Sequence, residues 1–247
     1  MPGISFDRVA AIYDATRGGE RRGNMLAGSI APHVTGTRVV ELGVGTGVIA
    51  KGLRQHGVEA TGMDLSAAML ESAIGRLGPR VAQADVDRLP LADASIDTVL
   101  FVWVLQLVAD PLVTLGEAAR VLRPGGRVVA LPSTAEYDPD DEMAPIIARL
   151  GPLRTHRLPA SEIAGARLPH LELVHEGFTA WDGFSQAPSE EADNIEQRLY
   201  SSLFDVDDAS WQRVVVPVID ALRALPDPER PRIRRNRHPL LVWSCQS

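Results

Sequence analysis

The chain is 247 residues long, 45% hydrophobic and 23% charged, which predicts one globular α/β domain with a sizeable core. Its net charge of −7 argues against broad nucleic-acid affinity, because phosphate backbones attract clustered positive charge. The single cysteine has no partner for an intrachain disulfide, no apolar run approaches the roughly 20 residues of a membrane helix, and no basic-then-apolar leader opens the chain. We expect a cytoplasmic protein, a monomer or homodimer, that binds no membrane, nucleic acid or metal.

Short apolar runs alternate with helical stretches between residues 36 and 132. This β-α-β alternation predicts a mostly parallel sheet with helices on both faces. The expected strands are 37–42, 59–64, 80–84, 95–103 and 127–132, and the expected helices are 50–55, 67–77 and 111–122.

The flanking segments are expected to complete one domain. Residues 1–35 have a helical pattern, 133–169 a helix–loop pattern, and 189–225 an amphipathic helical pattern with a break near 205–208. Alternating apolar residues predict a sixth strand at 170–181 and a seventh at 238–245. We therefore expect a single domain, 1–247, with a ligand-binding core at 36–132 and covering elements at 1–35 and 133–230.

The most informative motif is Glu41-Leu42-Gly43-Val44-Gly45-Thr46-Gly47 after the first strand. Alternating glycines allow a tight turn into a helix and a close approach of the backbone to a ligand. A dinucleotide site favours Gly-x-Gly-x-x-Gly, and here Val48 stands where that third glycine would fall. A carboxylate at Glu41 suits a ligand with ammonium and sulfonium groups better than a pyrophosphate. The alternative is a glycine-rich turn without a ligand.

Two aspartates follow the next strands. Asp64 ends the second strand, where an acidic side chain can accept bonds from both ribose hydroxyls, although it can equally cap the helix that begins near Ser66. Asp85 ends the third strand, where it can accept a bond from an adenine amino group while Val86 covers the ring. The alternative for Asp85 is a surface turn.

In order and spacing, these motifs resemble those of the class I S-adenosylmethionine-dependent methyltransferases, in the small-molecule branch that includes the ubiquinone and menaquinone C-methyltransferases (methyltransferase type 11). The resemblance covers about residues 5–132 and includes a similar opening helix at 6–14. It implies a Rossmann-like, seven-stranded, mostly parallel sheet with helices on both faces and a helical lid. Its motifs are Glu41–Gly47, Gly62–Ser66, Ala84–Pro90, Asp97–Trp103 and Leu122–Gly126.

The resemblance also implies the residues that bind S-adenosylmethionine. Its methionine part would lie against Glu41, Gly43 and Gly45, and its ribose against Asp64. Tyr13 and Arg17 would cover the cofactor from the N-terminal helix, unless that helix only packs on the sheet edge. The adenine would lie against Asp85, Val86, Leu65 and Met69, and the sulfonium near Phe101.

The residue that would act on the methyl acceptor is not defined by a motif. A histidine is common near position 106 in relatives of this branch, whereas this chain has Gln106, which can orient an acceptor but cannot take its proton. His156 and Tyr200 are the other candidates, since both lie in segments expected to cover the site. The five arginines of 230–237 either meet an acidic acceptor or form a solvated approach to the last strand.

We therefore expect methyl transfer to a small molecule, at oxygen, nitrogen or carbon, by in-line displacement aided mainly by alignment and desolvation. One alternative is a protein that keeps the cofactor as a structural element for another reaction or a binding role. A less favoured alternative is an NAD-dependent oxidoreductase. We further expect the N-terminal helix and the helices of 189–225 to close over the carboxyl edge of the sheet.

Overall fold

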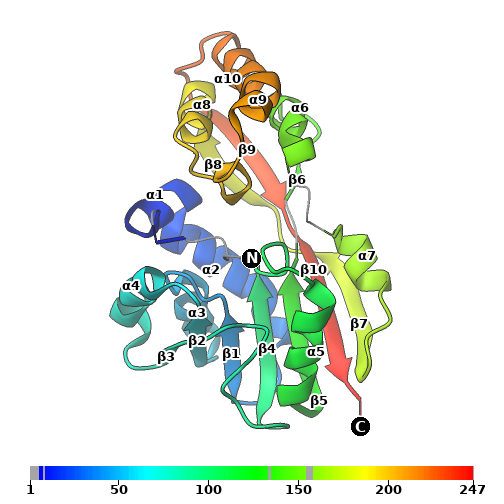
Figure 1. The fold of residues 1–247 in the computed structure, drawn as a ribbon. Helices are drawn as coiled ribbons and strands as arrows, with labels where there is room; N and C mark the ends of the chain where they lie inside the picture. Colours follow the sequence, from blue (N-terminus) through cyan, green and yellow to red (C-terminus); the bar gives the residue numbers. More distant parts are fainter. Residues whose placement is uncertain (1–5, 8, 133–134, 154–157, 247) are drawn as a thin grey trace.

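The computed structural model describes residues 6–7, 9–132, 135–153 and 158–246. Figure 1 shows a lower α/β part and an upper cap, with the short helix α1 (Tyr13–Arg17) beside the junction between them. The main sheet has the strand order β3-β2-β1-β4-β5-β10-β7. Its strands are β1 Val39–Leu42, β2 Ala60–Asp64, β3 Val81–Gln83, β4 Ile96–Val102, β5 Leu122–Leu131, β7 Leu171–Phe178 and β10 Pro239–Cys245.

The direction of β10 matters for the site. The strands β1 to β5 pair in parallel, whereas β10 pairs antiparallel with both β5 and β7. The first residues of β10 therefore lie at the same edge of the sheet as the last residues of β1, β2 and β4. Ligands of open α/β sheets bind at this edge.

Helices cover both faces of the sheet. Leu100 and Val102 of β4 pack in the cluster formed with α2, α3 and α4, whereas Val99 and Phe101 pack in the cluster formed with α5 and α7. This alternation is the period of a strand buried on both faces. The helices are α2 Gly19–Ile30, α3 Val48–Leu53, α4 Ala67–Leu77, α5 Pro111–Val121 and α7 Ala160–Gly165.

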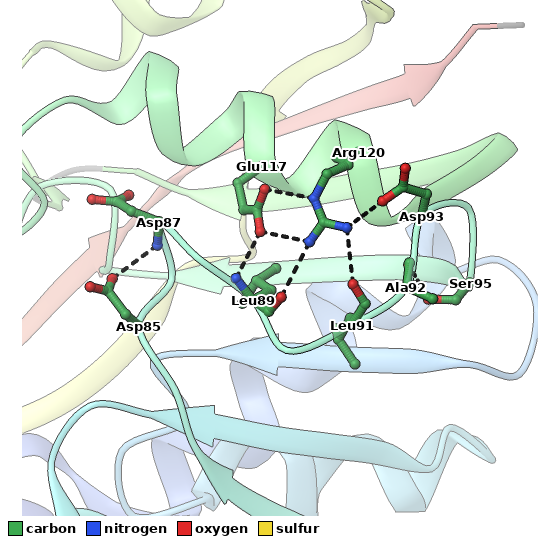
Figure 2. A network of polar contacts seen from close by, with 9 residues as sticks. All are labelled: Asp85, Asp87, Leu89, Leu91, Ala92, Asp93, Ser95, Glu117 and Arg120. Carbon is green, nitrogen blue, oxygen red and sulfur yellow. Dashed lines mark hydrogen bonds and ion pairs between the residues drawn. The ribbon is translucent and has the colours of Figure 1, made fainter.

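The loop that follows β3 is fastened to α5, as Figure 2 shows. The Arg120 guanidinium donates to the carbonyls of Leu89 and Leu91 and pairs with Asp93 at 2.5 Å. Glu117 in turn accepts a bond from the Leu89 amide at 2.7 Å. These contacts fix the path of the segment that carries Asp85.

The cap combines a small sheet with helices around its own core. Its three-stranded sheet has the order β6-β9-β8, and buried side chains such as Met143, Ile195 and Leu222 pack beneath the helices. The strands are β6 Glu136–Tyr137, β8 Asp182–Gln186 and β9 Arg232–Arg237. The cap helices are α6 Ala144–Ile147, α8 Pro188–Glu196, α9 Asp208–Ser210, a π-helical turn Trp211–Val215 and α10 Val216–Arg223, with 3₁₀ turns at Ala148–Leu153 and Ser201–Leu203. Further 3₁₀ turns lie outside the cap, at Ala10–Ile12, Ala31–His33 and Arg54–His56.

The seven-stranded, mostly parallel sheet is confirmed, and two expectations need correction. The lid is not purely helical, since it contains a three-stranded sheet. Residues 230–237 are not a solvated approach to the last strand, because most of them form β9, in which Arg234 and Asn236 are each 3% exposed. The strand was missed because its buried positions are polar, so it lacks the apolar alternation that marks a strand.

Candidate active site

The glycine-rich turn after β1 has an unusual backbone. Gly43, Gly45 and Gly47 all have positive φ, between 55° and 80°. A Cβ on Gly43 would clash with Val104, and one on Gly47 would press on Leu77. A Cβ on Gly45 would meet no atom within 4 Å. Gly45 is therefore the position where the backbone borders open space that a ligand can enter.

Asp64 holds this turn at the end of β2. Its Oδ2 accepts a bond from the Gly45 amide at 2.8 Å, and its Oδ1 accepts one from Ser66 at 2.9 Å. Burial raises the pKa of this half-buried carboxyl. Ser66 caps α4 instead, since its Oγ accepts the Met69 amide. The predicted capping role thus belongs to Ser66, and Asp64 remains beside the open space at Gly45.

Glu41 lies in β1 just before the turn. Its side chain is 2% exposed, and its Oε2 has no hydrogen-bond partner among the described residues. Burial raises its pKa to about 8. A buried carboxyl with a free oxygen is well matched to a cationic ligand group, which would restore the ionised form.

The residues expected around adenine occupy different environments. Asp85 is exposed and accepts the Asp87 amide at 3.0 Å, while Val86 packs against the α5 side of the core. Leu65 is 58% exposed, and Met69 is buried at the junction with the N-terminal segment and the cap. Phe101 is fully buried in the core. The first four flank the carboxyl ends of β2 and β3, whereas Phe101 has no exposed surface at the edge.

The helix α1 is tied to the glycine-rich turn. Asp14 accepts a bond from the Thr46 hydroxyl at 2.6 Å and pairs with Arg76 at 2.5 Å. Tyr13 packs beside a small cluster of Val9, Met69, Leu199 and Phe204, which joins the N-terminal segment, α4 and the cap. The N-terminal segment therefore lies against the glycine-rich turn and α4 at the carboxyl edge of the sheet.

Arg17 bridges α1 and the cap. Its Nη2 donates to the carbonyl of Leu199 at 2.7 Å, and its guanidinium lies 4.2 Å from the centroid of the Tyr200 ring. Arg17 lines the cleft described below, and its guanidinium already has these protein partners.

A cleft of about 980 Å³ opens between the sheet edge and the cap. Its walls come from α1, α2, the segment after β4, and all three cap strands. Four of the residues expected at the site line it, namely Tyr13, Arg17, Gln106 and Tyr200. His156 lies outside the described residues.

One wall of the cleft was not predicted. Trp103, the first residue after β4, has φ +59°, which is strained for a bulky side chain. Its ring lies 4.4 Å from the Arg22 guanidinium and 5.0 Å from the His238 ring. His238 is the single residue between β9 and β10, is 2% exposed, and accepts a bond at Nε2 from Arg22 at 2.9 Å. Burial and the nearby Arg22 lower the pKa of His238 to about 3.

The cap contributes a buried polar network to the opposite wall. The Tyr200 hydroxyl donates to Glu191 Oε2 at 2.5 Å, and Gln186 donates to the same oxygen at 2.7 Å. Arg234 donates to Gln186 and pairs with Asp141 at 2.8 Å. Burial raises the pKa values of both Glu191 and Tyr200. Tyr200 is therefore a hydrogen-bond donor near neutral pH rather than a base.

Two further findings concern the described residues only. None of their helices is long and apolar enough to cross a membrane. They contain no group of three or more histidine, cysteine, aspartate or glutamate side chains placed to hold a metal ion.

Comparison with known proteins places this geometry in a family. Residues 40–130 match the family model described as "Methyltransferase domain". The chain carries a class I methyltransferase domain. The match spans the glycine-rich turn, Asp64, Asp85 and β4, and so covers the cofactor side of the site but little of the cap.

Two curated relatives extend the match. The chain is 40% identical over 132 residues to the demethylmenaquinone methyltransferase of Mycobacterium sp. (strain KMS), which covers 50% of this chain and 56% of the relative. It is 34% identical over 169 residues to the malonyl-[acyl-carrier protein] O-methyltransferase of Pectobacterium atrosepticum, covering 67% and 66%. The chain thus spans little more than half the length of the first of these relatives.

Solved structures show the same fold at low identity. A phosphoethanolamine N-methyltransferase of Haemonchus contortus, solved with S-adenosylhomocysteine, aligns with a TM-score of 0.53 at 18% identity, over 98% of this chain and 58% of its own. A [4+2]-cyclase named SpnF aligns with a TM-score of 0.58 at 17% identity, over 98% and 94%. At this identity the likeness concerns the fold and not the reaction.

Proposed function

We propose that the chain transfers a methyl group from S-adenosylmethionine to a small-molecule acceptor, at oxygen, nitrogen or carbon. The observation that carries this proposal is the open space beside Gly45 at the carboxyl edge of the sheet, where the Gly45 amide donates to Asp64. Glu41, in the strand that precedes the turn, has a buried Oε2 without a partner among the described residues. The methyltransferase-domain match over residues 40–130 supports it.

The residues at the edge fit this cofactor. The unpartnered Glu41 Oε2 suits the ammonium group of the methionine part, and the gap at Gly45 admits its chain. Asp64 holds a carboxylate at the end of β2, where ribose hydroxyls would bind. We assign Tyr13 and Arg17 to the part of the site that covers the cofactor. We assign the adenine to the surface formed by Leu65, Met69, Asp85 and Val86. Phe101 would act from within the core, by supporting β4.

The cofactor, when bound, supplies a methyl group that is already activated for displacement. The task of the chain is then to align the acceptor and to exclude water. Gln106, whose buried Oε1 has no partner among the described residues, would orient the acceptor from the segment after β4. The Tyr200 hydroxyl, which donates its proton to Glu191, would accept a hydrogen bond from the acceptor on the cap side of the cleft. Where the acceptor must lose a proton, Glu191 is the best placed carboxylate, since burial raises its pKa toward that of a useful base.

We also propose that different segments of one domain bind the cofactor and the acceptor. Residues 36–132 would bind the cofactor, whereas 1–35 and 133–230 would cover it and select the acceptor. The cleft supports this division because most of its lining comes from these two flanking segments.

The test is a search for methylated products. Purified chain, S-adenosylmethionine and a small-molecule extract are incubated together, and mass spectrometry follows S-adenosylhomocysteine and compounds that gain one CH₂ unit. We expect both to rise together and to disappear in Gly45→Val. Cofactor binding without any product would instead favour the structural use of the cofactor, and NAD binding would favour an oxidoreductase.

A further inference from the structure

The cleft gathers buried polar atoms that lack partners. Among the described residues, seven side-chain nitrogen and oxygen atoms are buried without a hydrogen-bond partner, and four of them belong to residues that line the cleft. A buried polar group left unpaired is costly, so such groups are rare in folded proteins and call for an explanation. These four are Arg22 Nε, Gln106 Oε1, Arg234 Nη2 and Asn236 Oδ1.

Arg22 differs from Arg21 and Arg234, two other arginines of the cleft. Arg21 pairs with Asp182 through both carboxylate oxygens, at 2.5 and 3.2 Å, and Arg234 pairs with Asp141. Arg22 makes no ion pair within the described ranges. The one hydrogen bond of its side chain there is to His238, a residue that burial keeps neutral at pH 7.

The surroundings hold the Arg22 guanidinium in one orientation. Its plane is stacked against Trp103, and His238 engages Nη2. His238 is in turn fixed by Thr179, whose hydroxyl accepts the His238 amide at 3.0 Å. A guanidinium that is held in place, partly desolvated and without a carboxylate in direct contact is a strong site for a planar anion.

We propose that Arg22 binds a carboxylate group of the methyl acceptor, an inference that rests on the proposed function. A single negative charge fits better than a phosphate dianion, because Arg21 and Arg234 of the same cleft already pair with Asp182 and Asp141. The amides of Gln106 and Asn236 bind a second polar group of the same molecule, since an amide can turn either end toward its ligand. Aromatic walls formed by Trp103, Tyr137 and Phe184 favour a flat body between these groups.

The experiment compares matched acid and amide probes on the protein saturated with S-adenosylhomocysteine. Benzoate with benzamide, and 3-phenylpropanoate with 3-phenylpropanamide, differ only in the charged group. We expect each acid to bind at least about tenfold more tightly than its amide, because a charge-assisted bond is gained. Arg22→Gln removes this preference, Arg22→Lys retains part of it, and the exposed Arg213→Gln leaves it unchanged.

Affinity for S-adenosylhomocysteine, measured on the same variants, separates the possible failures. We expect Arg22→Gln to bind S-adenosylhomocysteine as the parent does. A parent that fails to bind it refutes the proposed function itself. A large loss of affinity for S-adenosylhomocysteine that is confined to Arg22→Gln assigns Arg22 to the cofactor's carboxylate and overturns the inference. Equal affinities of the parent for acid and amide also overturn it. A preference for acids that survives in Arg22→Gln also overturns it.

Discussion

One side of the proposed site is formed mainly by the backbone, and the other mainly by side chains. The cofactor side consists of a backbone turn with positive φ at Gly43, Gly45 and Gly47, held by one carboxylate, Asp64. The acceptor side consists of long side chains stacked on one another, such as Arg22 on Trp103. A backbone turn fixes one ligand shape, whereas a wall of side chains can be exchanged residue by residue. The difference explains how one cofactor site can serve many acceptors.

Gly45→Val should have the largest effect. We expect the affinity for S-adenosylhomocysteine to fall more than about 100-fold, because the side chain enters the space beside the turn. Gly57→Val is the matched control, since Gly57 also has positive φ and open space where a Cβ would lie, yet it follows α3 away from the site. Both variants should lose stability by about 1–3 kcal/mol from backbone strain. Equal binding by the two variants in calorimetry would remove Gly45 from the site.

Asp64→Ala should weaken the binding of S-adenosylhomocysteine by about 1–3 kcal/mol, because a charge-assisted bond is lost. The Gly45 amide also loses its acceptor, so the turn is loosened. Asp85→Ala offers a comparison on the next strand, where the carboxylate is exposed and a smaller loss is expected. Unchanged affinity in a folded Asp64→Ala variant contradicts its assignment to the ribose.

The raised pKa of Glu41 leads us to expect that cofactor binding depends on pH. Its pKa is raised to about 8 in the free protein, so its carboxyl is mostly neutral at pH 7. An ammonium group beside it lowers this pKa, and binding then releases a proton. Affinity should rise by up to about tenfold per pH unit below pH 8 and level off above it. Calorimetry at pH 7 in two buffers with different ionisation enthalpies measures the released proton, which should be absent in Glu41→Gln.

The smallest expected effect concerns the cover over the cofactor. S-Adenosylhomocysteine should slow amide hydrogen exchange in residues 9–20 and in the glycine-rich turn, on the order of tenfold, because Asp14 ties α1 to Thr46. Residues 208–223 of the cap should change less until an acceptor is present. Identical exchange in residues 9–20 with and without the ligand would make α1 a scaffold and remove Tyr13 and Arg17 from the site.

The glycine-rich turn could be predicted from the sequence because its residues are close together along the chain. Strand, glycine turn and helix follow one another within 39–53, so local pattern and ligand contact coincide. The seven strands and their mostly parallel sheet also followed from alternation and from the resemblance to a known family. Phe101 shows the limit of that resemblance, since its place within β4 puts it in the core.

The acceptor side could not be predicted in this way. Arg22 and His238 are 216 positions apart and meet only because β10 runs antiparallel, which brings its first residue to the ligand edge. The apolar pattern of one strand does not indicate whether that strand runs parallel or antiparallel to its neighbours. The strand β9 was missed for a related reason, since Arg234 is buried through its pairing with Asp141, and an arginine-rich segment has the pattern of a solvated surface.

Titration of S-adenosylhomocysteine and of NAD into the purified chain tests the central claim most directly. The glycine turn with Asp64 and Glu41 predicts that S-adenosylhomocysteine binds at one site per chain, that Gly45→Val abolishes this binding while Gly57→Val does not, and that NAD produces no binding heat. Binding of NAD in place of S-adenosylhomocysteine, or equal binding by the two glycine variants, would contradict it.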